Sequence, residues 1–493
     1  MLVNPPQARR LGFVMRQEFK LLFAERSLWA VGLMFLLLIG YAVANGLTQT
    51  AARDRAQAAV TEADQSTRAT QRARLEAIRA GLATPLPFDN PADPSGMAGN
   101  YGGQHAVLPS AALGPVALGQ SDLFPSQFKV TNQSRVGFMN PSDIENPWHL
   151  LSGHFDLAFV LVYLMPLLIF AVSYNLLSAE RESGTLRLLL SQPLRLRTLL
   201  AGKLSVRAVV LLGPAVLVPV GVLLLARQAG LTGEGAAAGT TTMWWALLVA
   251  AYALFWFALV VAVNAFGASS ATNAMVLVIA WVLLVLVAPV LLNLAVTQAV
   301  PTPSRTELAT RTRVLTAEAM KRHADLLATD YEHVGRGAAL LPQDGKINIS
   351  ARALGNYAIQ RELDDALRPE LELFDRQQQR QQALLGRVGM LSPAAVAFEG
   401  MTALAGTGAR RHARFVAQTV EFHKTWKGFF HPLIDSRTAL LPQDFDRIPA
   451  FVWQEEPPAL VHRAAAMGVL QLLVPSLLLF GLAAWRLRRL SVS

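Results

Sequence analysis

Six long apolar stretches limit what this chain can fold into more than any other feature of its sequence. A bilayer core about 30 Å thick needs roughly 20 apolar residues as helix, because unpaired backbone groups cannot be left in hydrocarbon. Of the 493 residues, 53% are hydrophobic and only 16% are charged, which exceeds what one soluble core absorbs. We therefore predict a mainly α, polytopic membrane protein with six transmembrane helices. The six stretches are Leu28–Leu47, Leu157–Leu177, Val206–Ala226, Met243–Phe266, Ala274–Val296 and Ala464–Trp485.

Two features of these spans leave alternatives open. Prolines inside spanning helices mark kinks where neighbours satisfy the freed carbonyls, and a gating role is the alternative. Ala42-Val43-Ala44 looks like the cleavage site of a signal peptide. We expect an uncleaved anchor instead, because the apolar run and the leader before it are both longer than in a usual signal peptide. The prolines are Pro166, Pro214, Pro219, Pro289 and Pro475.

Basic residues gather beside three of the span ends and predict the orientation of the chain. The positive-inside rule places such residues in the cytoplasm, so both termini and the loop between the second and third spans are expected there. These basic residues are Arg9, Arg10, Arg16, Lys20, Arg26, Arg181, Arg187, Arg195, Arg197, Lys203, Arg486, Arg488 and Arg489.

By elimination, two long segments are expected outside. The first begins with a polar helical run and then becomes rich in proline and glycine. The second is mostly helical, with Leu363, Leu367, Leu371 and Phe374 on one apolar face. The hexapeptide ALLPQD occurs at Ala339 and again at Ala439; we interpret it as a repeated turn signal, and a duplicated module is the alternative.

The predicted organisation has seven segments. The first is amphipathic, with Leu11, Val14 and Leu22 broadly on one face, so it is expected to lie in the headgroup plane, an ordinary basic flank being the alternative. The segments are 1–26, a cytoplasmic amphipathic interfacial helix; 27–48, transmembrane helix 1; 49–155, extracytoplasmic insertion 1; 156–298, transmembrane helices 2–5 with a cytoplasmic loop at 178–205; 299–460, a helical extracytoplasmic insertion 2; 461–486, transmembrane helix 6; and 487–493, a basic cytoplasmic tail.

The sequence lacks the motifs of the common enzyme classes. It contains no GxxxxGK[ST] phosphate loop, no HExxH zinc motif, no GxSxG elbow and no cysteine. We therefore expect no enzymatic activity, no metal and no directly bound cofactor. An ion-coupled carrier usually keeps an ionisable group at mid-membrane. The polar residues inside these spans are instead amides and hydroxyls such as Ser173, Asn264 and Asn293. Free energy for any work is expected from a partner.

The loop between the second and third spans has the composition of a transmission element. Glu180, Arg181 and Glu182 precede a flexible Ser183-Gly184-Thr185 step, and a leucine-rich run then ends at Pro193. A short helix here could bind a cytoplasmic partner through its charged end and pack its leucines against the bundle. It would then transmit a movement of the partner to the spans. The alternative is that the basic residues only follow the positive-inside rule and the leucines are core.

The same residues resemble a known family. Glu180-Arg181-Glu182-Ser183-Gly184-Thr185-Leu186, then LLLSQP and Gly202-Lys203, closely resembles the E-R-E-x-G-T-L … L-L-x-x-P … G-K signature of ABC-2 type permeases, the membrane subunits of ABC transporters. The topology of a basic surface helix followed by six spans is similar too. GQSDLFPSQFKVT and IENPWHLLSGHFDLAFVLVYLMPLL are typical of a branch with large extracytoplasmic insertions, similar to the NosY/GldF-like permeases.

The resemblance implies a type V exporter-like permease whose loop binds a separate cytoplasmic ABC ATPase subunit. It also implies ATP use by that partner alone, a second permease in a homodimer or with a sister permease, and a multi-pass location in the bacterial inner membrane. No nucleic acid is expected as a partner. Arg187 stands where the family often has an acid, so an ion pair there is replaced or reversed. The implied ATPase-coupling residues are Glu180, Arg181, Glu182, Gly184, Thr185, Leu186, Leu189 and Pro193.

Three hypotheses follow for the function. The leading one is a permease subunit of an ABC-2 type transporter that couples ATP hydrolysis to export across or out of the inner membrane. The second is an ATP-driven mechanical or maturation factor that acts on a periplasmic partner through its outer segments, which are too long to be plain connectors. The third is a membrane-anchored binding protein without energy coupling.

Overall fold

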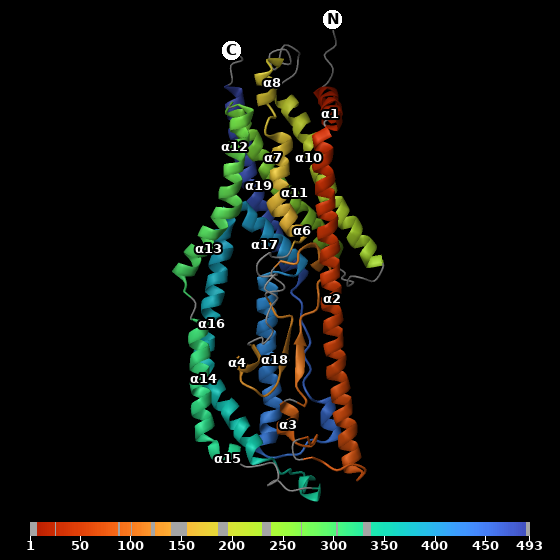
Figure 1. The fold of residues 1–493 in the computed structure, drawn as a ribbon, viewed down its shortest axis with the longest axis vertical. Helices are drawn as coiled ribbons and strands as arrows, with labels where there is room; N and C mark the ends of the chain where they lie inside the picture. Colours follow the sequence, from red (N-terminus) through yellow and green to blue (C-terminus); the bar gives the residue numbers. More distant parts are fainter. Residues whose placement is uncertain are drawn as a thin grey trace.

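The apolar stretches fold into helices that run side by side at the end of the molecule carrying both termini (Figure 1). The computed structural model describes residues 7–24, 26–86, 89–99, 101–119, 124–139, 155–185, 196–228, 238–267, 269–301, 304–328 and 337–489. Among these residues, six helical segments are long and apolar enough to cross a membrane, as predicted. We call them the span bundle: α2 (Arg26–Arg79), α6 to α8 (Leu157–Glu182), α10 (Leu196–Gln228), α11 (Ala238–Ala265), α12 to α13 (Ser270–Ala299) and α19 (Pro458–Arg488).

Helix α11 is the centre of the span bundle. Its large side chains Trp245, Tyr252 and Trp256 are each at most 1% exposed, and they pack with residues from every other span into one apolar cluster. The burial of these large side chains among residues of all the other spans places α11 at the centre. The faces of α10 and of α12 to α13 are more exposed and present leucine and valine side chains outward.

Two prolines in the spans are each preceded by a wide helical turn. The π-helical segment η2 (Val160–Leu164) lies between α6 (Leu157–Phe159) and α7 (Met165–Ser173), and η3 (Val282–Val287) lies between α12 (Ser270–Trp281) and α13 (Ala288–Ala299). A proline leaves a carbonyl of the preceding turn without its helical N–H donor. Here such carbonyls accept hydrogen bonds from side chains of other segments. Tyr252 Oη donates to the Val162 carbonyl at 2.7 Å, and Ser392 Oγ donates to the Leu284 carbonyl at 2.9 Å. The expectation that neighbours satisfy such carbonyls is confirmed at both positions.

Helix α2 continues without a break far beyond the span bundle (Figure 1). Its second half is rich in Ala, Arg, Gln and Glu and has no proline or glycine before Gly81, so nothing in the sequence ends the helix earlier. Gly81 adopts a φ of +74°, and the amide of Leu82 donates to the Ala77 carbonyl, a glycine-based helix end. With 54 residues, α2 is roughly 80 Å long.

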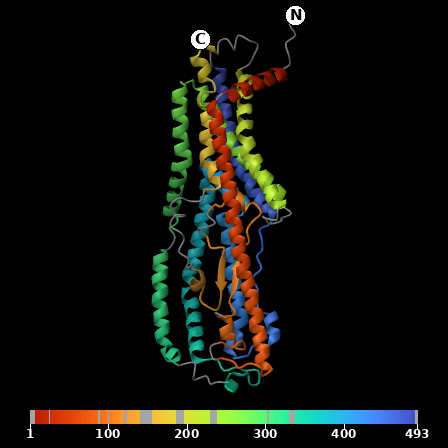
Figure 2. The ribbon, with the colours of Figure 1, turned by 45° about the vertical axis from the view of Figure 1, so that its right-hand side comes forward.

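The part of the molecule away from the termini, which we call the distal domain, is built around helices α16 (Ala351–Val388) and α18 (Ala409–Asp435). A two-stranded antiparallel sheet, β1 (Gln104–Val107) with β2 (Gln127–Val130), lies between these helices and α2 (Figures 1 and 2). The smaller elements are α3 (Pro94–Ala98), η1 (Gly114–Val116), α4 (Arg135–Met139), α14 (Arg305–Arg322), α15 (Ala324–Ala328), η5 (Gly337–Leu340), η6 (Gly389–Leu391) and η7 (Pro442–Asp446).

Two apolar clusters hold the distal domain together. One is aromatic: Phe415, Trp426 and Phe430 of α18 are fully buried against the sheet and the loop after α18. The other joins α16 to α14 through Leu363 and Leu367, which lie on the apolar face that the sequence predicts. The distal half of α2 contributes Leu75 to the aromatic cluster and is also held by polar contacts, among them Asp64 to His105, Arg72 to Asp446 and Arg74 to Asp89.

The two ALLPQD hexapeptides lie near each other at the far end of the distal domain. Asn90 Nδ2 donates to the Leu340 carbonyl of the first, and the Leu440 amide of the second donates to the Ala92 carbonyl. Their local structures differ. The first ends in a turn with positive φ at Asp344, and the second forms η7.

A short helix of the second long segment packs with the spans instead of the distal domain. Helix α17 (Pro393–Ala405) contributes Val396, Met401 and Leu404 to the apolar cluster around α11. A side chain at Gly400 would meet Leu248 of α11 at 2.6 Å, so this glycine allows the close approach of the two helices. The sequence alone does not indicate that this helix packs with the spans.

Acid should destabilise the distal domain through its buried histidine. His423 is 5% exposed and donates through Nε2 to the Gln133 carbonyl at 2.9 Å, and burial lowers its pKa to about 4. Because the unfolded chain binds this proton near pH 6.5, the stabilisation is present above that pH and is lost as pH falls toward 4, by up to roughly 3 kcal/mol. Thermal unfolding of the full chain in nanodiscs between pH 4.5 and 7.5 measures the loss. Burial also lowers the pKa of His431, so His423→Gln should reduce the pH dependence without abolishing it, and an unchanged pH dependence would contradict this assignment.

Candidate functional site

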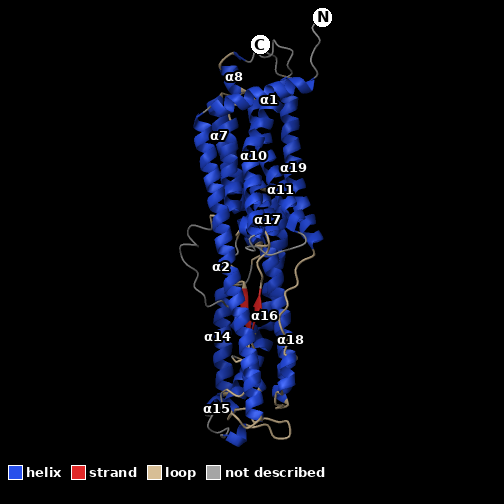
Figure 3. Ribbon diagram, turned by 90° about the vertical axis from the view of Figure 1, so that its right-hand side faces the viewer, coloured by secondary structure: helices blue, strands red, loops and turns tan. Residues whose placement is uncertain are grey.

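The acidic residues of the signature stretch lie at the end of the span bundle that carries the termini, on the short helix α8 (Ser178–Glu182) (Figures 1 and 3). Glu180 forms an ion pair with Lys203 of α10, with 2.5 Å between Oε1 and Nζ, and the two side chains are 17% and 11% exposed. Lys203 also reaches the Leu176 carbonyl. The glutamate and lysine at the two ends of the signature therefore contact each other, and they join α8 to the third span.

Glu182 joins α8 to the fifth span. Its carboxylate accepts from the backbone amide of Ser270 at 2.6 Å and from the Ser270 hydroxyl at 2.9 Å, at the first turn of α12. A carboxylate at a helix N-terminus satisfies a free N–H group and interacts favourably with the helix dipole. The Ser178 hydroxyl contacts the Ser270 hydroxyl as well, at 2.8 Å.

Arg181 lies over the turn between α11 and α12. A Cβ at Gly267 would be 2.4 Å from Nη1 of Arg181, and Gly267 has a φ of +81°, so this position favours glycine for two reasons. Below the turn, Asn264 Oδ1 accepts from the Leu177 amide and from Asn273 Nδ2. Helix α8 is thus in contact with the ends of the third, fourth and fifth spans.

The Ser183-Gly184-Thr185 step ends α8. Gly184 has a φ of +71°, and the hydroxyls of Ser183 and Thr185 each donate to the Glu180 carbonyl at 3.3 Å. Five of the eight predicted coupling residues are therefore described: Glu180, Arg181, Glu182, Gly184 and Thr185. Leu186, Leu189 and Pro193, and Arg187 with them, lie outside the described residues.

A second ionic contact at this end joins the N-terminal helix α1 (Gln7–Ala24) to the bundle. Glu18 and Arg207 are 4% and 8% exposed, and Glu18 Oε1 lies 2.9 Å from Nε and 2.6 Å from Nη2 of Arg207. Arg207 also donates to the Val172 carbonyl of α7. Arg207 is an exception to the expected scarcity of ionisable residues in the spans, since it lies inside the third predicted span.

Gly202 of the signature has a structural role in the same contact. A Cβ at this position would meet Cγ1 of Val14 in α1 at 2.6 Å, so the absence of a side chain allows α1 to cross α10 closely. One sequence signal could have indicated the Glu18 contact. Glu18 shares the apolar face of α1 with Leu11, Val14 and Leu22, where an acid requires a buried cation.

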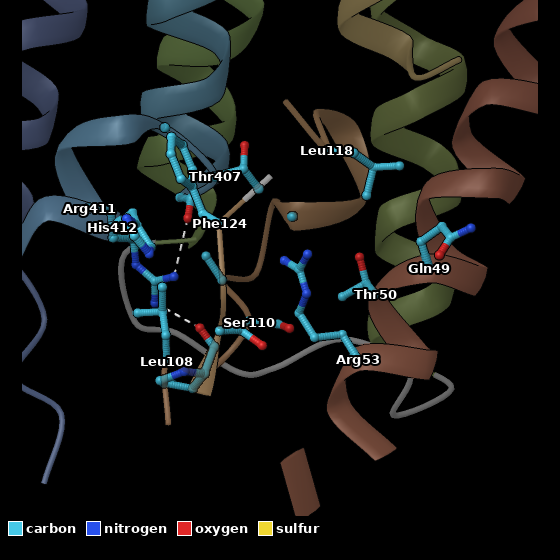
Figure 4. A pocket seen from close by; sticks show the side chains of 16 residues that line it. Gln49, Thr50, Arg53, Leu108, Ser110, Leu118, Phe124, Thr407, Arg411 and His412 are labelled. Atoms are coloured by element: carbon cyan, nitrogen blue, oxygen red, sulfur yellow. Dashed lines mark hydrogen bonds between the residues drawn. The ribbon is translucent and has the colours of Figure 1, made fainter. Parts of the chain in front are cut away.

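The described residues enclose a small cavity away from the signature stretch. One cavity of about 40 Å³ lies between α2, the loop after β1 and the turn from α17 to α18 (Figure 4). Arg411 beside it donates to the carbonyls of Gly406 and Pro109 and pairs with Glu455. Such a cavity has room for little more than a water molecule. No group of three His, Asp or Glu side chains among the described residues could hold a metal ion.

Comparison with known proteins identifies the family. A family model described as ABC-2 family transporter protein matches residues 13–489, nearly the whole chain. The chain belongs to the ABC-2 family of transporter proteins. It is a membrane permease of the ABC transporter class, and the family implies an ABC ATPase partner and a membrane. Neither the curated proteins nor the solved structures give a match.

Proposed function

We propose that this chain is the permease subunit through which a separate cytoplasmic ABC ATPase drives export across or out of the bacterial inner membrane. The observation that carries the proposal is the pair of contacts made by α8: Glu180 to Lys203 and Glu182 to Ser270. Through them, one short helix at the end of the bundle is fastened to two different spans. The residues that resemble the family's coupling signature are the same residues that make these contacts.

In this proposal, α8 and the loop that follows it receive the movement of the ATPase. A push on α8 acts on α10 through the Glu180–Lys203 ion pair and on α12 through the carboxylate of Glu182. A ligand shifts a conformational equilibrium only by its different affinity for the two states. ATP bound to the ATPase pair would favour one arrangement of α8, and its contacts would carry that preference to the spans.

The proposal includes the expected surroundings of the chain. Both termini and α8 lie in the cytoplasm, the distal domain lies outside, and the permease pairs with a second copy or a sister permease. ATP is bound and hydrolysed by the partner, and this chain binds no cofactor directly and has no enzymatic activity. The closer relation to the NosY/GldF-like permeases belongs to the same proposal.

A second candidate function, an ATP-driven mechanical factor, is favoured by helix α2. This single helix of 54 residues belongs to the span bundle and also to the distal domain, where it is held by Gln57, Asp64, Arg72 and Arg74. A continuous helix transmits a tilt of its spanning part to the distal domain. The second function would use that movement on a periplasmic partner without moving a solute.

Co-purification with an ABC ATPase encoded beside this chain tests the proposed function. The wild-type chain should form a stable complex in nanodiscs that hydrolyses ATP, and Glu180→Lys with Glu182→Lys should abolish both complex and ATP turnover. Glu62→Lys, on the exposed distal part of α2, is the matched control. Failure of any ATPase to bind, or a charge reversal without effect, would overturn the proposal. Cargo accumulation in vesicles separates export from the mechanical function.

A further inference from the structure

An apolar groove of about 360 Å³ opens beneath helix α1, on the side of the bundle formed by α2, α7 and α10. Its lining residues from α1 place it at the end of the bundle that carries α8. Helix α1 lies across the spans at that end (Figures 2 and 3). The walls of the groove include side chains from α1, α2 and α10. Among these side chains are Leu22 and Phe23 of α1, Leu33 and Leu36 of α2, and Val210 and Pro214 of α10.

The groove offers an occupant almost no polar contact. Among the described residues that line it, Arg207 is the only charged one, and its guanidinium already contacts the Glu18 carboxylate and the Val172 carbonyl. The charge of Arg207 is therefore neutralised from the protein side. The remaining lining is aliphatic or aromatic, so the groove fits a hydrocarbon occupant and no polar solute.

The mouth of the groove has the composition of a membrane interface. Phe23 lies between Phe19 and Trp29, with ring centroids 4.2 Å and 5.0 Å away, and the Trp29 indole donates to the Phe23 carbonyl. Two exposed cations, Lys20 and Arg26, lie within one turn of Phe23 along the chain. Aromatic rings and cations together are typical of the level of lipid headgroups.

We propose that this groove binds one acyl chain of an anionic phospholipid from the leaflet in which α1 lies. The hydrocarbon chain fills the groove between α2 and α10, and the phosphate lies near Lys20 and Arg26. Because the groove opens on a lipid-facing side of the spans, hydrocarbon from the bilayer reaches it without a gate. A second copy of this chain is the less suitable occupant, because it would bring the same cations against the same mouth.

Gly32 provides a variant that fills the groove without disturbing its walls. It lies in the lining of α2, and a Cβ added there meets no atom within 4 Å. Gly40, two turns further along α2, has equally open surroundings but is not part of the lining. Gly32→Phe therefore places a ring in the groove, and Gly40→Phe is a control of the same size on the same helix.

Photo-crosslinking tests the lipid site. The chain is reconstituted in nanodiscs containing phosphatidylglycerol with a diazirine in the middle of one acyl chain, and the labelled peptides are identified by mass spectrometry. The label should map to the groove segments of α2 and α10. Gly32→Phe should reduce it at least fivefold, and Gly40→Phe should leave it unchanged. Excess unlabelled phosphatidylglycerol should compete more strongly than phosphatidylcholine, a result that does not depend on any variant.

Several outcomes would overturn the proposal. Labelling that is undiminished by Gly32→Phe, or equal competition by the two phospholipids, would exclude a site for an anionic lipid. A second copy in the groove is detected separately. Since the chain contains no cysteine, Val209→Cys introduces a single thiol in the lining, and efficient disulfide dimerisation with loss of lipid labelling would assign the groove to a second copy.

Discussion

Replacing Arg207 by methionine should detach α1 from the bundle and lower the stability of the chain by about 3–5 kcal/mol. The variant leaves the Glu18 carboxylate in a position only 4% exposed, without the two nitrogens that now contact it. An unpaired buried charge costs far more than the loss of a surface ion pair. Denaturant unfolding in detergent micelles measures the loss, and proteolysis at the basic residues of α1 measures the detachment.

The double variant Glu18→Met with Arg207→Met is the matched control for this prediction. Replacing both members of a buried ion pair by apolar side chains of similar size is often neutral or stabilising. The double variant should therefore be within about 1 kcal/mol of the wild type and should keep α1 protected from protease. Additive effects of the two single substitutions would show that the two charges do not stabilise each other, contrary to their geometry.

Much of the span bundle was predictable because the bilayer constraint acts on local sequence. Each apolar stretch must form its backbone hydrogen bonds within itself, so its position and type follow from composition over roughly 20 residues. Gly81 likewise predicts where α2 ends, since it is the first residue after the polar run that readily adopts a positive φ. In such segments the local sequence is sufficient to predict the secondary structure that the folded chain adopts.

Other features depend on contacts between distant residues and were not predictable. Helix α17 is too short for a span, and only its packing against α11 and α19 explains why its apolar side chains are buried there. The π-helical turns precede Pro166 and Pro289, but Pro214, Pro219 and Pro475 lie in regular α-helix, and the donors Tyr252 and Ser392 lie far away in sequence. The local sequence around Pro166 or Pro289 does not indicate which residue donates a hydrogen bond to the preceding turn.

The candidate site also has features that the sequence predicts and features that it does not. The Ser183-Gly184-Thr185 step indicates a flexible end after the acids, and the structure has the end of α8 there, with a positive φ at Gly184. The partners of the two acids, Lys203 and Ser270, are 23 and 88 residues away in the chain. A sequence pattern of charges identifies the segment, but only the fold determines whether its acids contact other spans or a partner protein.

Reversing the charge of Glu180 should reduce the ATP turnover of the permease–ATPase complex at least tenfold, on the proposed function. Glu180→Lys would place two ammonium groups together at a site where both side chains are now less than one-fifth exposed. Two like charges about 4 Å apart near a protein surface repel by about 4 kcal/mol, so α8 should separate from α10. Steady-state ATP hydrolysis by the complex in nanodiscs measures the effect.

The reciprocal change in Lys203 distinguishes coupling through this ion pair from a contact between Glu180 and the ATPase itself. Glu180→Lys combined with Lys203→Glu restores an ion pair of opposite polarity between α8 and α10. If the pair transmits movement to the third span, the double variant should recover most of the ATP turnover that the single variant loses. If Glu180 acts by contacting the ATPase, the double variant should remain as inactive as Glu180→Lys, because the charge presented to the partner is still reversed. That second result would place the coupling surface on α8 and assign the Glu180–Lys203 contact to stability alone.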